Sequence, residues 1–376
     1  MPTMPADSCC VEPLLRGAVS SPSPGRQTAA CPVVDQEIDE DGRRNHTRRD
    51  GLRAASHRRG VSMGRSDGRE VVVICLPDVP ERRHVGDLPA NVEVVLLPGR
   101  PGPLPDLTRV ELVIPADWAR QAVLAEFGAM AHLRVVQALS AGVDWLRGRV
   151  PSGITVCNAR GVYDGPVAEW VVGAILAIQR GLVESRDAQL KKQWRPFEPE
   201  ELAGLRVVIL GFGSIGAAVA DRLRPFRVDV VGVARMRRQG VLGLDDLDEV
   251  LQSADILIDL LPLSAETAGF VDAHRLALLP PGALLVNAGR GATVDTPALV
   301  EALQAGHLRA ALDVTDPEPL PSNHPLWRLP NVLVSPHVAG DSPTSLARAY
   351  ALVGDQIRRF AAGERLENEV PSHLLD

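Results

Sequence analysis

The stretch RVVILGFGSIGAAVADRL at residues 206–223 decides the fold. An apolar run rich in valine leads into glycines at relative positions 1, 3 and 6, and a run with helical spacing follows. Glycines so spaced permit a tight turn, a close approach of the backbone to a pyrophosphate, and close packing of helix on strand. The pattern therefore predicts a dinucleotide-binding loop at a helix N-terminus. The cofactor contacts expected from this loop are Gly211, Gly213, Ser214, Ile215 and Gly216.

Strand-like runs continue after this loop, and helical segments lie between them. Such a series is typical of a doubly wound parallel sheet. A long apolar helix is expected before it, at 164–182, with Pro166 in the first turn, where a missing N–H is harmless. The six expected strands are LRVVILG at 205–211, VDVVGVA at 228–234, ADILIDLLP at 254–262, ALLVNAGRG at 283–291, RAALDVTD at 309–316 and NVLVSPHVAG at 331–340.

A second series of short apolar runs precedes the helix. Runs of this length that are apolar on both faces and separated by 10 to 20 residues indicate buried parallel strands. We therefore expect an α/β protein with two doubly wound parallel-sheet domains, one a Rossmann nucleotide domain and the other flavodoxin-like. The runs of the first domain lie at 71–77, 92–98, 110–115 and 133–140.

Composition narrows the function classes. The 376 residues carry a net charge of −7 and no run of 18 apolar residues, so neither nucleic acid nor a membrane is an expected partner. Five cysteines form no CxxC pair, which fits a reducing, cytoplasmic location. Asp255 and Asp259 could imitate a metal pair, but they alternate within an apolar run without histidine or cysteine, and no metal is expected.

Residues 1–68 differ from the rest of the chain. They contain no Phe, Trp or Tyr and are rich in Ser, Pro, Asp and Arg. Such a segment buries too little apolar surface to offset its ordering entropy. We expect either a disordered extension or a mis-assigned start, with Met63 as the alternative first residue.

The end of the second strand of the nucleotide domain bears on the choice of cofactor. NAD enzymes of this fold carry an acidic residue there for the ribose 2′-hydroxyl, whereas an arginine accommodates a 2′-phosphate. Here Ala234 occupies that place, and Arg235, Arg237 and Arg238 follow it. The segment favours NADP over NAD, the alternative being a solvated basic turn.

Three polar residues stand at carboxyl ends of expected strands, where open α/β sheets place their active sites. Arg290 could hold a substrate carboxylate in a planar fork. His337 could exchange a proton with a hydroxyl or carbonyl, while Glu318 fixes its ring and favours its protonated form. Together, Arg290, Glu318 and His337 describe hydride transfer to a 2-oxo acid.

These residues converge on a known family. From about residue 70 to 370 the chain resembles the D-isomer-specific 2-hydroxyacid dehydrogenases, close to their glyoxylate/hydroxypyruvate reductase-like branch. The motifs that carry the resemblance are LSAGVD at 139–144, GFGSIG at 211–216, LLPLSAET at 260–267, LLVNAGRG at 284–291, ALDVTDPEPLP at 311–321 and SPHVAG at 335–340.

The resemblance implies roles for individual residues. It assigns Arg290 to the substrate, His337 to acid/base catalysis and Glu318 to orienting that histidine. It assigns Asp313 to the amide of the nicotinamide. Further cofactor contacts are implied at Leu261, Pro262, Thr267 and Ala288. Backbone N–H groups for the substrate carboxylate are implied at Ala141, Gly142 and Val143.

The resemblance also implies a discontinuous substrate-binding domain, made of 69–165 and 341–376, around an NAD(P)-binding domain at 166–340. The implied reaction is NAD(P)H-dependent reduction of small 2-oxo acids to 2-hydroxy acids, with the proton supplied by His337, in a homodimer. An alternative from another class is a nucleotide-sensing binding protein, since relatives of this fold serve as co-repressors.

Overall fold

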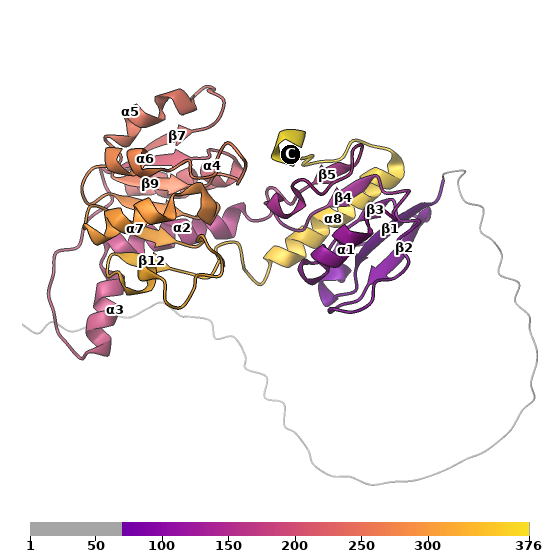
Figure 1. The fold of residues 1–376 in the computed structure, drawn as a ribbon, viewed down its shortest axis with the longest axis horizontal. Coiled ribbons are helices and arrows are strands. Elements are labelled where there is room, and N and C mark those ends of the chain that lie inside the picture. Colours follow the sequence, from indigo (N-terminus) through magenta and orange to yellow (C-terminus); the bar gives the residue numbers. More distant parts are fainter. Residues whose placement is uncertain (1–69, 376) are drawn as a thin grey trace, which may run out of the picture. The chain divides into compact units, whose positions relative to one another are not determined.

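The computed structural model describes residues 70–375, which form two parallel sheets with helices on their faces (Figure 1). The predicted extension at 1–68 lies outside the described residues.

The first sheet contains five parallel strands in the order β2-β1-β3-β4-β5. One face packs on a long C-terminal helix, whose Tyr350, Val353 and Ile357 join Ile74 and Leu112 in one buried cluster. The opposite face is covered by a shorter helix and by loops. The elements are β1 (Val72–Pro77), β2 (Val92–Leu97), β3 (Leu112–Val113), α1 (Arg120–Glu126), β4 (Val135–Gln137), β5 (Thr155–Cys157) and α8 (Ser345–Ala362).

The second sheet contains seven parallel strands in the order β12-β11-β10-β9-β6-β7-β8. Because every pairing in this sheet is parallel, the carboxyl ends of all its strands meet at one edge. The elements are α2 (Asp164–Gln179), α3 (Leu182–Leu190), β6 (Arg206–Leu210), α4 (Ser214–Leu223), β7 (Asp229–Val233), β8 (Val241–Leu242), α5 (Leu247–Leu251), β9 (Ile256–Asp259), α6 (Ala273–Leu278), β10 (Leu284–Asn287), α7 (Thr296–Gln304), β11 (Arg309–Leu312) and β12 (Val332–Val334).

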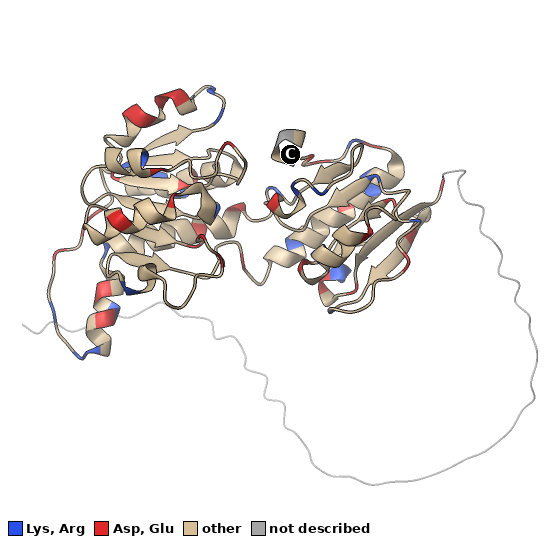
Figure 2. Cartoon of the chain, in the orientation of Figure 1, with Lys and Arg blue, Asp and Glu red and all other residues tan. Residues whose placement is uncertain are grey.

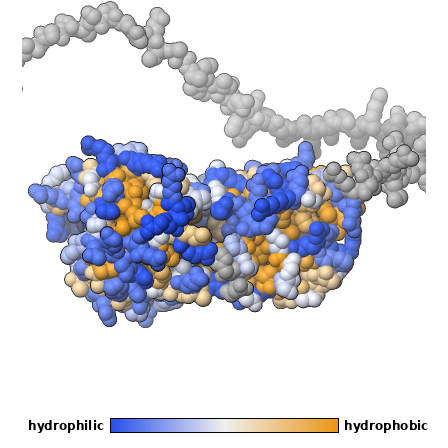
Figure 3. All heavy atoms as spheres, turned by 90° about the horizontal axis from the view of Figure 1, so that it is seen from above, coloured by the Kyte–Doolittle hydropathy of each residue, from blue (hydrophilic) through white to orange (hydrophobic). Residues whose placement is uncertain are grey.

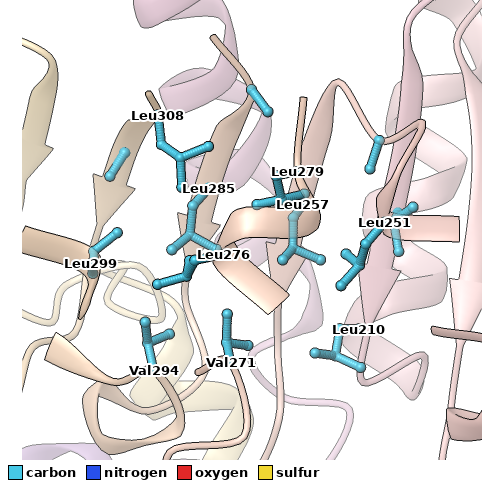
Figure 4. Close-up of a cluster of buried hydrophobic side chains, with 14 of the residues drawn as sticks. Leu210, Leu251, Leu257, Val271, Leu276, Leu279, Leu285, Val294, Leu299 and Leu308 are labelled. Carbon is cyan, nitrogen blue, oxygen red and sulfur yellow. The ribbon is translucent and has the colours of Figure 1, made fainter. Parts of the chain in front are cut away.

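Both faces of the second sheet are buried. Helices α2 and α4 cover one face. On the other, Leu210, Leu257 and Leu285 of successive strands pack against Leu251 of α5 and Leu276 of α6 (Figure 4). Burial on both faces explains why these strands are continuous apolar runs without alternation.

The expected α/β fold with two doubly wound sheets is confirmed, and two details differ. The helix predicted at 164–182 ends at Gln179, because Gly181 takes a left-handed conformation (φ +61°) from which α3 starts afresh. Two short strands were not predicted: β5 has three residues and β8 has two, too few to give a recognisable run.

No single helix within residues 70–375 is long and apolar enough to cross a membrane; α2 and α3 meet the length and composition test only together, as a pair bent by 64°. Charged residues of both signs are interspersed over both sheets and their helices (Figure 2). On the face seen in Figure 3, apolar residues form separate patches within a mostly hydrophilic surface.

Candidate active site

The glycine-rich loop follows β6 directly and turns into α4. Gly211 has φ +89°, and a Cβ there would lie 2.8 Å from the carbonyl group of Leu260. Gly211 is therefore required both for its conformation and for a backbone contact that cannot yield. Gly213 precedes the helix, and a Cβ on it would meet nothing within 4 Å, which leaves space beside the N–H groups of the first turn.

A cavity of about 450 Å³ opens beside this loop. It extends from the loop to the carboxyl ends of β7 and β9 and contains no aspartate. Eight of the predicted positions line it together: Gly211, Gly213, Ala234, Arg235, Arg238, Leu261, Pro262 and Thr267. The Thr267 hydroxyl donates to the Pro262 carbonyl (2.6 Å) and so fixes the turn between them.

Several predicted cofactor residues have other partners. Nη2 of Arg237 contacts both carboxylate oxygens of Asp246, at 2.5 Å from Oδ2, and Arg237 does not line the cavity. The Ser214 hydroxyl donates to Asp164 (3.1 Å). Ile215 packs against the buried core, and the Ala288 N–H donates to the Asp259 carbonyl (3.1 Å). A Cβ on Gly216 would come within 3.2 Å of the Gly211 carbonyl oxygen, so this glycine serves helix packing.

Sequence reasoning missed the apolar lining of the cavity. The missed residues come from four separate segments that only the fold brings together, although the position of Phe212 inside the loop was a usable signal. They are Phe212, Met236, Leu244, Leu260, Phe270, Pro371 and Leu374, together with the polar Ser264 and Glu266.

His337 and Glu318 are in direct contact. Nδ1 of His337 lies 2.6 Å from Oε1 of Glu318, and both side chains are a little over 40% exposed, at 44% and 42%. A carboxylate can only accept, so Nδ1 carries the proton of this hydrogen bond. The other ring nitrogen, Nε2, has no partner within residues 70–375 and is available to a ligand.

Asp313 holds the loop that carries this histidine. Its Oδ1 accepts from the Val338 N–H (2.9 Å) and the Ser335 hydroxyl (2.5 Å), and its Oδ2 accepts from the Ala339 N–H (2.9 Å). The His337 N–H donates to the Asp313 carbonyl (2.8 Å), and His337 itself has φ +54°. Asp313 is 2% exposed, and these bonds keep His337 in a backbone conformation that few side chains adopt.

Arg290 follows β10 and is one-quarter exposed. Its Nε donates to Asp144 Oδ1 (2.9 Å), and its Nη1 donates to the Gly289 carbonyl (2.7 Å). A Cβ on Gly142 would collide with the guanidinium, so the SAGVD loop can approach it only because residue 142 is glycine. Asp144 was not singled out from the sequence, although it belongs to the same motif.

The SAGVD loop has its carbonyl groups in hydrogen bonds and its N–H groups available to a ligand. Asn158 donates to the Ala141 carbonyl (2.8 Å), and the Ser140 hydroxyl donates to the Gly142 carbonyl (2.6 Å). Nothing among the described residues accepts from the N–H groups of Ala141, Gly142 or Val143. The loop can therefore bind an anion through its main chain.

Asp259, at the end of β9, is a fully buried carboxyl group. Burial raises its pKa to about 6, and hydrogen bonds from Thr293 and Leu261 partly oppose that shift. Neither Asp259 nor any other described residue belongs to a cluster of three His, Cys, Asp or Glu that could hold a metal ion.

Comparisons with known proteins agree on one family. Residues 172–339 match the family model described as D-isomer specific 2-hydroxyacid dehydrogenase, NAD binding domain. The chain is 36% identical over 253 residues to a glyoxylate reductase of Thermofilum pendens, covering 63% of this chain and 74% of that protein. It is 35% identical over 244 residues to glyoxylate/hydroxypyruvate reductase A of Serratia proteamaculans, covering 60% and 77%.

Solved structures give the same result. A D-isomer specific 2-hydroxyacid dehydrogenase from Xanthobacter autotrophicus, in complex with NADPH and MES, aligns with a TM-score of 0.70 and 31% identity over 80% of this chain and 98% of that one. An NADPH-dependent glyoxylate/hydroxypyruvate reductase from Sinorhizobium meliloti, in complex with NADP and sulfate, aligns with a TM-score of 0.70 and 29% identity over 81% and 99%.

The role of Asp313 can be tested by Asp313→Asn. An amide has one accepting oxygen where the carboxylate uses two for three donors, so at least one buried donor loses its partner. The free energy of unfolding should fall by roughly 1–3 kcal/mol, measured by urea denaturation. The control is Asp316→Asn, an exposed aspartate on the following loop. An equal loss in both variants would contradict the role given to Asp313.

Proposed function

Because this chain belongs to the D-isomer-specific 2-hydroxyacid dehydrogenase family, we propose that it reduces small 2-oxo acids of the glyoxylate and hydroxypyruvate class to 2-hydroxy acids with NADPH. Members of this family are NAD(P)-dependent oxidoreductases. The observation that carries the proposal is the 2.6 Å contact between His337 and Glu318, which leaves Nε2 available at the carboxyl edge of the second sheet.

The residues beside the glycine-rich loop fit a dinucleotide. The space over Gly213, the N–H groups of α4 and the 450 Å³ cavity suit a pyrophosphate and an adenosine. Residues 166–340 would thus form the NAD(P)-binding domain, and 69–165 with 341–376 the substrate-binding domain. When bound, the cofactor supplies the hydride.

The chain's own residues would supply the other parts of the reaction. The planar fork of Arg290 and the main-chain N–H groups of Ala141, Gly142 and Val143 would hold the substrate carboxylate. Nε2 of His337 would give its proton to the carbonyl oxygen as that oxygen becomes a hydroxyl, and would regain one from solvent. Glu318 would orient the ring and stabilise the charged imidazolium before the transfer.

The dyad is tested with His337→Ala and Glu318→Gln. Loss of the proton donor should lower kcat by roughly 10² to 10⁴, whereas Glu318→Gln should cause a smaller fall because the ring remains but is held less firmly. Cofactor affinity, measured by quenching of intrinsic fluorescence, should stay near that of the wild type in both. Unchanged kcat in both variants would remove the dyad from the mechanism. A wild type that binds cofactor but turns over no 2-oxo acid would favour the nucleotide-sensing alternative.

The preference for NADPH rests on one end of the cavity. Ala234 stands where an aspartate would repel a 2′-phosphate, and Arg235 and Arg238 line the same cavity. Arg238 already donates to the Phe212 carbonyl, which keeps its side chain beside the loop. Two of the solved relatives described above were crystallised with NADPH or NADP.

The cofactor proposal is tested by the ratio of kcat/KM for NADPH and NADH. Each charge-assisted hydrogen bond to a 2′-phosphate contributes roughly 1.5–3 kcal/mol, less where solvent screens it, so the ratio should lie well above ten. Ala234→Asp combined with Arg235→Ala should reverse it. Arg237→Ala is the matched control, because Arg237 pairs with Asp246 outside the cavity. A wild-type ratio near one would contradict the proposal.

A homodimer is proposed for the assembly. Helix α3 buries no residue, and Leu182, Leu190 and Trp194 in and after it are 57%, 64% and 97% exposed. A second copy would remove this apolar surface from water. The mass of the full chain by light scattering should be that of two copies, and Leu190→Ser with Trp194→Ser should halve it; a monomeric wild type at micromolar concentration would contradict the dimer.

A cytoplasmic location is proposed as well, since Cys75 and Cys157 are buried free thiols.

A further inference from the structure

A buried polar cluster lies directly beneath Arg290, outside the groups that the proposed reaction uses. The carboxyl group of Asp259 and the hydroxyl of Thr293 are both 0% exposed. Asp259 Oδ2 lies 2.6 Å from Thr293 Oγ1, and Asp259 Oδ1 accepts from the Leu261 N–H (2.9 Å). Thr293 Oγ1 lies a further 2.6 Å from the carbonyl oxygen of Arg290.

The protons in this cluster can be counted. A threonine hydroxyl has one hydrogen and can donate only once. Here it makes two contacts of 2.6 Å, one to a carboxyl oxygen and one to a carbonyl oxygen, and a carbonyl oxygen can only accept. With Asp259 ionised, one of the two short contacts would join two acceptors with no hydrogen between them. A hydrogen on Asp259 Oδ2 removes the conflict and gives every short contact a donor.

We propose that Asp259 is a positioning residue that acts in its protonated form. Its Oδ2–H donates to the Thr293 hydroxyl, and that hydroxyl donates to the Arg290 carbonyl oxygen, which fixes the main chain from which the guanidinium projects. Its Oδ1 holds the Leu261 N–H and thereby the loop that lines the cofactor cavity. The functional part of this inference rests on the proposed role of Arg290 in substrate binding.

The surroundings of Asp259 favour the neutral acid. On the flanking strands its register partners are Leu210 of β6 and Asn287 of β10, neither of which titrates. From the loops, Leu261 and Thr293 face it, and the Arg290 guanidinium is directed instead to Asp144 and to the Gly289 carbonyl. Since no cation among residues 70–375 is directed at it, burial dominates and raises the pKa of Asp259 to about 6.

Ionisation would loosen the substrate side of the cluster. The Thr293 hydroxyl would then turn to the carboxylate, since a charged acceptor is the stronger one. The Arg290 carbonyl oxygen would keep only the Asn287 side-chain amide (3.1 Å) and the Thr293 N–H (3.2 Å). Binding of the 2-oxo acid should therefore weaken as pH rises through the pKa of Asp259.

The test compares Asp259→Asn with Asp255→Asn from about pH 4 to about pH 9, a range that includes both the ordinary and the folded-state pKa of Asp259. Asparagine at 259 reproduces the neutral acid, because its oxygen accepts from Leu261 and its amide donates to Thr293 at every pH. Asp255 is the matched control. It immediately precedes β9, at the amino end of the strand that Asp259 ends, and it accepts a hydrogen bond from the Arg206 N–H (2.7 Å). Asp259→Leu, which cannot donate, is the disrupted variant.

The first readout is thermal stability, which does not depend on activity. An acid with a raised pKa in the folded state stabilises the protein fully below its ordinary pKa, and that contribution is lost as pH rises through the folded-state value. The Tm of Asp259→Asn should therefore gain several degrees on that of the wild type between about pH 4 and about pH 6 and stay level above, because the ordinary pKa and the folded-state pKa bound that window; Asp255→Asn should show no such trend. A constant Tm difference would overturn the protonated state, whatever the reaction.

The second readout is the KM for glyoxylate. In the wild type and in Asp255→Asn, log KM should rise at pH values above the pKa of Asp259, whereas Asp259→Asn should lack that rise. Asp259→Leu should raise KM about tenfold or more at every pH, with a smaller change in kcat. Identical KM profiles for the wild type and Asp259→Asn would overturn the link to Arg290. If no 2-oxo acid is turned over, the proposed function fails, while the Tm comparison still decides the protonation of Asp259.

Discussion

The candidate site depends most on the buried carboxylate of Asp313. It stands just beyond β11, the strand between β10 and β12, and it is joined by hydrogen bonds to the ends of both. Its side chain receives three donors from the loop after β12, and its main chain is tied to Asn287 and His337. A single residue thus sets the distance between the end of β10, where Arg290 follows, and the loop that carries the histidine. Because it is almost fully buried, water cannot substitute for any of these bonds.

The features that could be predicted from sequence are local ones. The glycine spacing at Gly211 to Gly216 and the apolar strand runs are each contained in a few consecutive residues, and both appear where they were expected. The pairing of Glu318 with His337 was predictable because both residues follow neighbouring strand ends. The resemblance assigns Asp313 a contact to the nicotinamide. In the structure its two carboxylate oxygens already accept hydrogen bonds from three donors in residues 335–339. No local sequence pattern predicts these partners.

Other features could not be read from the sequence, because they depend on which way a side chain turns. Arg237 and Arg238 are adjacent, yet the first pairs with Asp246 and the second reaches the glycine-rich loop. Asp255 and Asp259 look equivalent at the two ends of one strand, yet the first is partly exposed and the second is sealed in the sheet. A continuous apolar run predicts that its residues are buried, but the balance of donors and acceptors around a buried group is a property of the assembled fold.

The backbone contact of Gly211 has a consequence for how this protein can change. A Cβ there would strike the main chain of Leu260, so no repacking of side chains can rescue a substitution, and position 211 is restricted to glycine. The side chains of the turn at 234–238 line the cavity or, at Arg237, pair with Asp246, and none of these contacts requires a residue without a Cβ. At the proposed cofactor site, substitutions in the turn can therefore alter the choice between the two nicotinamide dinucleotides, while Gly211 keeps the loop that would hold their common pyrophosphate unchanged. In the proposed site, cofactor recognition is thus divided between a loop that is fixed at Gly211 and a turn that can vary.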